Sequence, residues 1–144
     1  MIVSNESTNQ PRIHRPWLHP LHAVLLAATV PLFLGALLSD LAYASSYQIQ
    51  WSNFSSWLIA GGLVFNGLAM VWAIVSRLVN RRSSGVYLLF LVSTFVLGFF
   101  NSLIHARDAW AMMPTGLILS AIVFLLACVS TWIGFAKLGV GGQR

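Results

Sequence analysis

The stretch Leu21–Ser39, LHAVLLAATVPLFLGALLS, is predominantly apolar and contains no Asp, Glu, Lys or Arg. Three further runs share these properties: Trp57–Val75, Val86–Ile104 and Gly116–Phe135. A helix needs about 20 apolar residues to cross a hydrocarbon core of ~30 Å. The period-two alternation that marks membrane barrels is absent from these runs. The sequence therefore predicts an all-α integral membrane four-helix bundle, with spans at about residues 21–40, 57–76, 86–105 and 115–135.

The composition excludes the other broad classes of protein. Of the 144 residues, 58% are hydrophobic and only 8% are charged, whereas soluble domains carry roughly 25% charged residues. Disordered chains are poor in the apolar residues that are abundant here. The single cysteine, Cys128, excludes a disulfide within the chain and a zinc site built from several cysteines.

The basic residues predict the orientation in the membrane. Seven of the eight lie in the N-terminal segment, between the second and third spans, or at the C-terminus: Arg12, Arg15, Arg77, Arg81, Arg82, Lys137 and Arg144. By the positive-inside rule, both termini are expected in the cytoplasm (N-in/C-in). We expect a flexible cytoplasmic tail at 1–15, a single domain at 16–136 and a short cytoplasmic tail at 137–144. The net charge of +5 is explained by anionic lipid rather than by nucleic acid.

A signal peptide is the alternative interpretation of the first span. Two arginines precede the apolar stretch, and Ala42-Tyr43-Ala44 after it resembles a cleavage site. The stretch is longer than the roughly 7–15 apolar residues of a signal peptide. We therefore expect it to remain as a membrane span.

Polar side chains recur at helical spacing on the first three spans. In the first span, one face carries His22, Thr29, Ala36 and Asp40. In the third span, one face carries Thr94, Gly98, Asn101 and His105. The amide of Asn66 lies near mid-membrane, where it needs a partner inside the protein. If these faces turn inward, they form an outer polar cluster of Asp40, Asn101, His105, Arg107 and Asp108.

Three interpretations of the outer polar cluster remain open. The first is a neutralised polar knot that fixes the register of the helices. The second is a binding site in which His105 takes up and releases protons under the influence of Asp40 or Asp108. The third is simple contact with lipid headgroups. Small residues such as Gly116 and Ser120 indicate helix packing rather than chemistry.

The remaining histidines do not predict a metal or haem site within one chain. The inner histidines His19 and His22 provide only two ligands at i, i+3 spacing. Haem b requires axial ligands from two elements at one depth, and His105 lies at the opposite end from these two. A haem bound to His105 would therefore need Met112, Met113 or a residue of a second copy as its second axial ligand. Haem b or quinone remains possible as a cofactor, and the common catalytic motifs are absent.

Three segments resemble a known family of bacterial membrane proteins, domain of unknown function 2231. They are HPLHAVLLAATVPLFLGALLSDLAY, WSNFSSWLIAGGLVFNGLAMVWAIV and FNSLIHARDAWAMMPTGLILSAIV. The most specific features are His19-Pro20 with His22, Asp40 at the end of the first span, and the run from Asn101 to Asp108. Family members open with HP-x-x-x-H, whereas here the spacing is H-P-x-H. The resemblance implies a four-helix protein of the bacterial inner membrane, sometimes encoded near quinoprotein sugar dehydrogenases.

Taken together, these features favour a non-enzymatic membrane anchor, scaffold or accessory subunit. The alternative is a redox module that binds haem or quinone at the outer polar cluster and works with a periplasmic dehydrogenase. A proton-linked transporter is a third hypothesis, although four helices leave little room for an enclosed pathway. The expected partners are the lipid bilayer and, as alternatives, a second copy or such a dehydrogenase, and no nucleic acid is expected.

Overall fold

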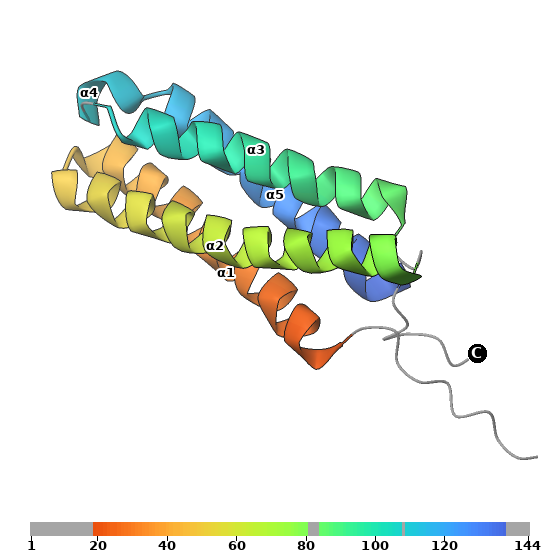
Figure 1. The fold of residues 1–144 in the computed structure, drawn as a ribbon. Coiled ribbons are helices and arrows are strands. Elements are labelled where there is room, and N and C mark those ends of the chain that lie inside the picture. The colour runs from red at the N-terminus through yellow and green to blue at the C-terminus, as the bar shows by residue number, and fades with distance from the viewer. Residues whose placement is uncertain (1–18, 81–83, 108, 138–144) are drawn as a thin grey trace, which may run out of the picture.

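The computed structural model describes residues 19–80, 84–107 and 109–137 (Figure 1). The helices are α1 (Pro20–Ser46), α2 (Ile49–Asn80), α3 (Gly85–His105), the single turn α4 (Ala109–Met112) and α5 (Thr115–Lys137). All four long helices are long and apolar enough to cross a membrane. The predicted all-α bundle of four membrane-spanning helices is thus confirmed. The predicted tail at 1–15 and residues 138–144 of the C-terminal tail lie outside the described residues, and the N-in/C-in orientation stays a prediction.

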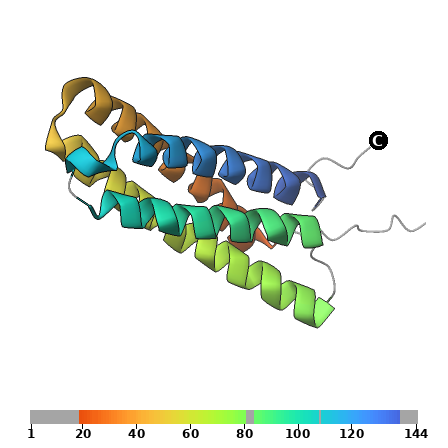
Figure 2. The same cartoon turned by 90° about the horizontal axis from the view of Figure 1, so that it is seen from above.

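The four long helices form a closed ring in which each helix has two neighbours. Both α1 and α3 pack against α2 and α5, and Figures 1 and 2 show consecutive helices running in opposite directions. The one-turn helix α4 lies at one end of the bundle, which we call the α4 end. The opposite end, where α1 and α3 begin and α2 and α5 stop, is called the basal end.

Local sequence explains where α1 begins and stops. The side chain of His19 caps the helix by accepting a hydrogen bond from the backbone N–H of Leu21, and Pro20 occupies the first turn, where its missing N–H costs nothing. At the other end Tyr47 adopts the left-handed conformation, with φ 55°, and its N–H bonds to the carbonyl of Tyr43. This tight turn leaves only Tyr47 and Gln48 between α1 and α2.

The second span differs from the prediction, because α2 begins at Ile49 rather than near residue 57. Polar residues between these positions lower the local hydropathy, which is why the apolar pattern does not extend to them. Two of them, Ser52 and Ser55, are buried and face the other helices. Their hydroxyls bond within the bundle, so the helix continues through a stretch that hydropathy alone assigns to a loop.

Apolar packing fills the middle and the basal half of the bundle. One buried cluster contains Leu26, Tyr87 and Leu91, and a second contains Phe33 with Val123. Phe33 approaches α2 closely at Gly62, where a Cβ atom would lie 2.8 Å from the ring. Large apolar side chains also remain exposed on all four long helices, as expected for a surface that faces lipid rather than water.

Candidate functional site

A buried ion pair lies near the α4 end. The Nε2 atom of His105, the last residue of α3, is 2.9 Å from Oδ1 of Asp40 on α1. Both side chains are fully buried. The sequence placed both residues in one outer polar cluster without choosing between Asp40 and Asp108 as the partner of His105, and in the structure Asp40 is in contact with His105.

Hydrogen bonds extend the ion pair to the other helices. Ser120 of α5 donates to Oδ2 of Asp40 at 2.5 Å, and the side-chain amide of Asn101 donates to Ser120 at 2.9 Å. From α2, the hydroxyl of Ser55 lies 3.3 Å from Nε2 of His105. We call these five residues, Asp40, Ser55, Asn101, His105 and Ser120, the interhelix cluster. It contains at least one side chain from every long helix.

Counting donors and acceptors gives the charge state of the interhelix cluster. Nδ1 of His105 lies 2.9 Å from the carbonyl oxygen of Asn101, which can only accept, so Nδ1 carries a hydrogen. Ser55 donates its one hydroxyl hydrogen to the carbonyl of Ala36 and therefore accepts from Nε2. Both imidazole nitrogens thus donate, while both oxygens of Asp40 accept. This pattern corresponds to a protonated His105 and an ionised Asp40, with no net charge.

Small and apolar residues close the cluster from the α4 side. A Cβ atom on Gly116 would lie 2.9 Å from Cγ of Met112 and 3.0 Å from Cε1 of His105. Met112 is fully buried, and its sulfur accepts a hydrogen bond from Ser52 at 3.6 Å. Glycine at position 116 therefore lets α5 approach both the Met112 side chain and the imidazole ring of His105.

The structure brings together only part of the predicted outer polar cluster. Asp40, Asn101 and His105 meet, whereas Arg107 lies exposed on the turn after α3. Asp108 lies outside the described residues. Two members of the interhelix cluster, Ser55 and Ser120, were not predicted to bind there, because Ser55 lies in the polar stretch before the predicted second span and Ser120 was assigned to helix packing. Their only clue was the depth that each shares with Asp40.

The inner histidines contact aromatic residues at the basal end. His22 is buried, and its Nε2 lies 2.7 Å from the hydroxyl of Tyr87. The ring of Trp72 lies beside both His19 and His22, with centroid distances of 5.0 and 6.4 Å. The Nδ1 atom of His19 accepts the capping hydrogen bond described above, so one nitrogen of each of these imidazoles is already engaged.

Asn66 lies in the buried middle of the bundle, as its sequence position predicts. Its amide nitrogen donates to the carbonyl of Leu91 on α3 at 3.2 Å. Within the described residues its Oδ1 atom has no hydrogen-bond partner, and the same holds for Oδ1 of Asn101 and Nδ1 of His22. The bond from Asn66 links α2 to α3 where the surrounding contacts are apolar.

The described residues do not fit haem b or a metal ion. Both nitrogens of His105 are already bonded, and iron ligation would leave Asp40 buried without its cationic partner. Met112, the possible second ligand, has its sulfur bonded to Ser52. Nowhere in the described part of the chain do three His, Cys, Asp or Glu side chains come together as a metal site would require.

One of three comparisons with known proteins gives a match. Neither the curated proteins nor the solved structures contain a significant match to the chain. A family model described as "Predicted membrane protein (DUF2231)" matches residues 18–140. This range includes all four long helices, the interhelix cluster and the inner histidines. The chain therefore belongs to the family of membrane proteins that share domain of unknown function 2231.

Proposed function

We propose that the protein is a non-enzymatic anchor or accessory subunit of the bacterial inner membrane, with both termini in the cytoplasm. The observation that carries the proposal is the interhelix cluster. Its charged and hydroxyl groups bond to one another across all four long helices, and the ion pair has no exposed surface. Such an arrangement holds helices in register and presents no reactive group to a substrate.

The surface supports the same proposal. Large apolar side chains are exposed along the helices, and aromatic residues at the ends, such as Trp57 and Trp132, are more than 70% exposed. Aromatic residues anchor helices at the membrane boundaries. A rigid bundle with an anchored apolar exterior suits a protein that holds a partner at the membrane.

Deletion of the gene in its native host tests the proposal. We expect at least one other protein to leave the membrane fraction, as measured by quantitative proteomics of washed membranes. Wild-type protein restores that partner, and so does Asp40→Asn, which keeps the hydrogen-bond geometry of the cluster. An unchanged membrane proteome, together with electron transfer or turnover by the purified protein alone, would contradict the proposal.

The topology is tested separately with reporters fused to the two termini. Both reporters are expected to show activity on the cytoplasmic side. A reporter active in the periplasm at either end would overturn the proposed orientation while leaving the fold intact.

A further inference from the structure

A layer of buried polar side chains lies in the middle of the bundle, between the two apolar clusters. Its members are Thr29 of α1, Asn66 of α2 and Thr94 of α3, and each is at most 1% exposed. We call these three residues the mid-bundle polar layer. They are separate from the interhelix cluster, which lies nearer the α4 end.

Contacts on both sides place the three residues at one depth. On the basal side they are flanked by a buried apolar cluster that has members on all three helices, among them Leu26, Ala69 and Leu91. Toward the α4 end they are flanked by the ring of Phe33, which approaches Gly62 and Gly98. On each helix the polar residue lies between these two levels, three or four residues from each. The layer therefore interrupts the apolar core from three sides.

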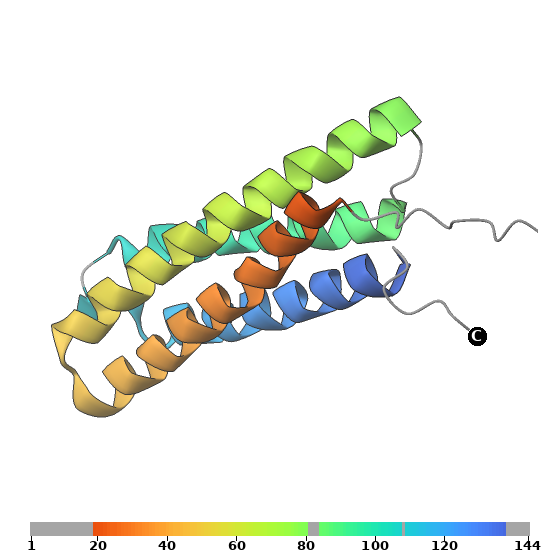
Figure 3. The same cartoon turned by 90° about the horizontal axis from the view of Figure 1, so that it is seen from below.

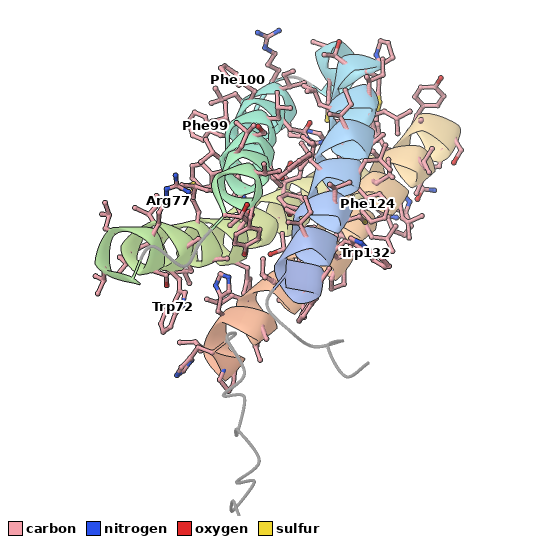
Figure 4. All side chains as sticks on the ribbon, turned by 90° about the vertical axis from the view of Figure 1, so that its right-hand side faces the viewer. Trp72, Arg77, Phe99, Phe100, Phe124 and Trp132 are labelled. Carbon is pink, nitrogen blue, oxygen red and sulfur yellow. The ribbon has the colours of Figure 1, made fainter. Side chains whose placement is uncertain are left out.

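The inward positions at this depth carry small side chains. On α5 the buried residue one turn basal of Val123 is Ala127. Figure 4 shows Phe99 and Phe100 of α3 pointing away from the other helices, so the inward face of α3 is left to Thr94 and its neighbours at helical spacing. Helix α1 lies between α2 and α5 (Figure 3), and it contributes a threonine here. Leucine and phenylalanine side chains occupy the levels on either side.

The hydrogen bonds of the mid-bundle polar layer leave one acceptor without a donor. The amide nitrogen of Asn66 donates to the carbonyl of Leu91 at 3.2 Å. Thr29 and Thr94 donate their single hydroxyl hydrogens to carbonyls of their own helices, at 2.9 and 2.8 Å. Within the described residues, Oδ1 of Asn66 has no partner. The two hydroxyl oxygens can only accept further bonds, so a ligand that binds here must donate hydrogen bonds.

The hydroxyl of Thr94 lies beside the amide of Asn66. Thr94 bonds to the carbonyl of Phe90, and Asn66 bonds to the next carbonyl along α3, that of Leu91. These are the i−4 and i−3 carbonyls of Thr94, the two that a threonine hydroxyl reaches in a helix. A small molecule with two polar hydrogens can therefore bridge the Asn66 carbonyl and the Thr94 hydroxyl oxygen.

The charge around the layer favours a neutral ligand. In the described part of the chain the one acidic side chain is Asp40, which forms its ion pair with His105 near the α4 end. Asp40 lies about 16 Å along α1 from Thr29, at 1.5 Å per residue. A cation buried in the layer would have no carboxylate beside it, which is unfavourable inside a membrane protein.

We propose that the mid-bundle polar layer binds one water molecule, which donates one hydrogen to Oδ1 of Asn66 and the other to the hydroxyl oxygen of Thr94. Buried polar groups that lack a protein partner are satisfied by internal water where the site is polar and has room for one molecule. The water adds a second polar link between α2 and α3, beside the direct bond from Asn66 to Leu91. The inference does not depend on the proposed anchoring function, because it requires only the folded chain.

NMR of the full chain in phosphatidylcholine nanodiscs tests the proposal, with isotope labels in the asparagine amides and the threonine methyl groups. Lipid surrounds the middle of the bundle, so a water signal there reports bound water. We expect magnetisation transfer from water to the side-chain amide of Asn66 and to the methyl group of Thr94. Replacing sodium by choline in the buffer is expected to leave both resonances unchanged.

A matched pair of substitutions locates the site. Asn66→Leu removes the unpaired acceptor at similar volume and is expected to abolish transfer from water to the Thr94 methyl group. Asn53→Leu makes the same substitution at an exposed position of α2 and is expected to leave this transfer unchanged. Thr94→Val keeps the shape of the side chain, removes the second acceptor and is expected to weaken transfer to the Asn66 amide. Thermal unfolding shows which variants are folded, and Thr94→Val decides the question if Asn66→Leu is not.

Three results would overturn the proposal. One is the absence of transfer from water to the Asn66 amide in the wild type, which would mean that a rotated threonine hydroxyl satisfies Oδ1. Another is transfer to the Thr94 methyl group that is the same in folded Asn66→Leu as in the wild type, or transfer to the Asn66 amide that Thr94→Val leaves unchanged. The third is a shift of the Asn66 resonances that requires sodium, which would show that the layer binds a cation.

Discussion

Replacing Asp40 separates the charge of the interhelix cluster from its shape. Asparagine has the same shape as aspartate, and its amide can donate to Nε2 of a neutral His105 while its carbonyl accepts from Ser120. Leucine has a similar volume but can do neither. The two variants therefore differ in whether the buried side chains of His105 and Ser120 keep a hydrogen-bond partner at position 40.

The expected magnitudes follow from the two hydrogen bonds that Asp40 accepts. Hydrogen bonds to charged groups contribute about 1.5–3 kcal/mol and neutral ones about 0.5–1.5 kcal/mol. Asp40→Asn loses this charge assistance but also avoids the cost of burying two charges, so we expect a loss of about 1–2 kcal/mol. Asp40→Leu leaves the imidazolium buried without its partner, which costs about 3–5 kcal/mol.

The assay is reversible unfolding in mixed detergent micelles, which gives the free energy of unfolding for each variant. Ser39→Ala is the control, because Ser39 is buried on the same helix but bonds to the carbonyl of Gly35 within α1. This substitution should lower the free energy of unfolding by less than about 1 kcal/mol. Nitrogen NMR of labelled histidine adds a direct reading of His105, expected to be protonated at both nitrogens in the wild type and at Nδ1 alone in Asp40→Asn. Equal losses in the two Asp40 variants, or a wild-type His105 with a single hydrogen, would refute the assigned charge state.

Three further predictions concern packing, the basal end and cofactors. Gly116→Ala should lower the free energy of unfolding by about 1–3 kcal/mol, because the added Cβ atom collides with Met112. Gly61→Ala is the control: its added Cβ atom would lie 3.6 Å from the nearest side-chain atom, in Leu32, so the substitution should be neutral or slightly stabilising in the same assay. Tyr87→Phe leaves Nε2 of buried His22 without a partner and should cost about 1–3 kcal/mol; an unchanged stability would mean that the bond is not formed. Protein produced with haem supplied should show no Soret absorbance band after purification, and a stoichiometric band would contradict the assigned bonding of the histidines.

Much of the fold could be predicted because membrane spans depend on local composition. The four apolar runs became four long helices, and the inward faces of α1 and α3 followed from helical spacing alone. The alternating direction of the spans placed Asp40 and His105 in the same outer cluster, but it did not distinguish Asp40 from Asp108 as the partner of His105.

The remaining features depend on contacts between segments that are distant in the sequence. Ser120 bonds to Asp40 across 80 residues, and nothing near either residue in the sequence specifies this pair. The early start of α2 was missed because Ser52 and Ser55 look like loop residues until their buried partners are known. Arg107 was placed in the outer polar cluster on depth alone, but the turn after α3 directs it outward.

The two ends of the bundle are held together in different ways. At the α4 end, the interhelix cluster links all four long helices, so separating any one of them breaks a buried hydrogen bond or the ion pair. At the basal end, the bond between His22 and Tyr87 joins α1 to α3, and the rings of His19 and His22 lie beside Trp72 of α2. Loss of the Tyr87 hydroxyl therefore removes one polar link between two helices, whereas loss of the Asp40 carboxylate removes contacts of α1 to both α3 and α5.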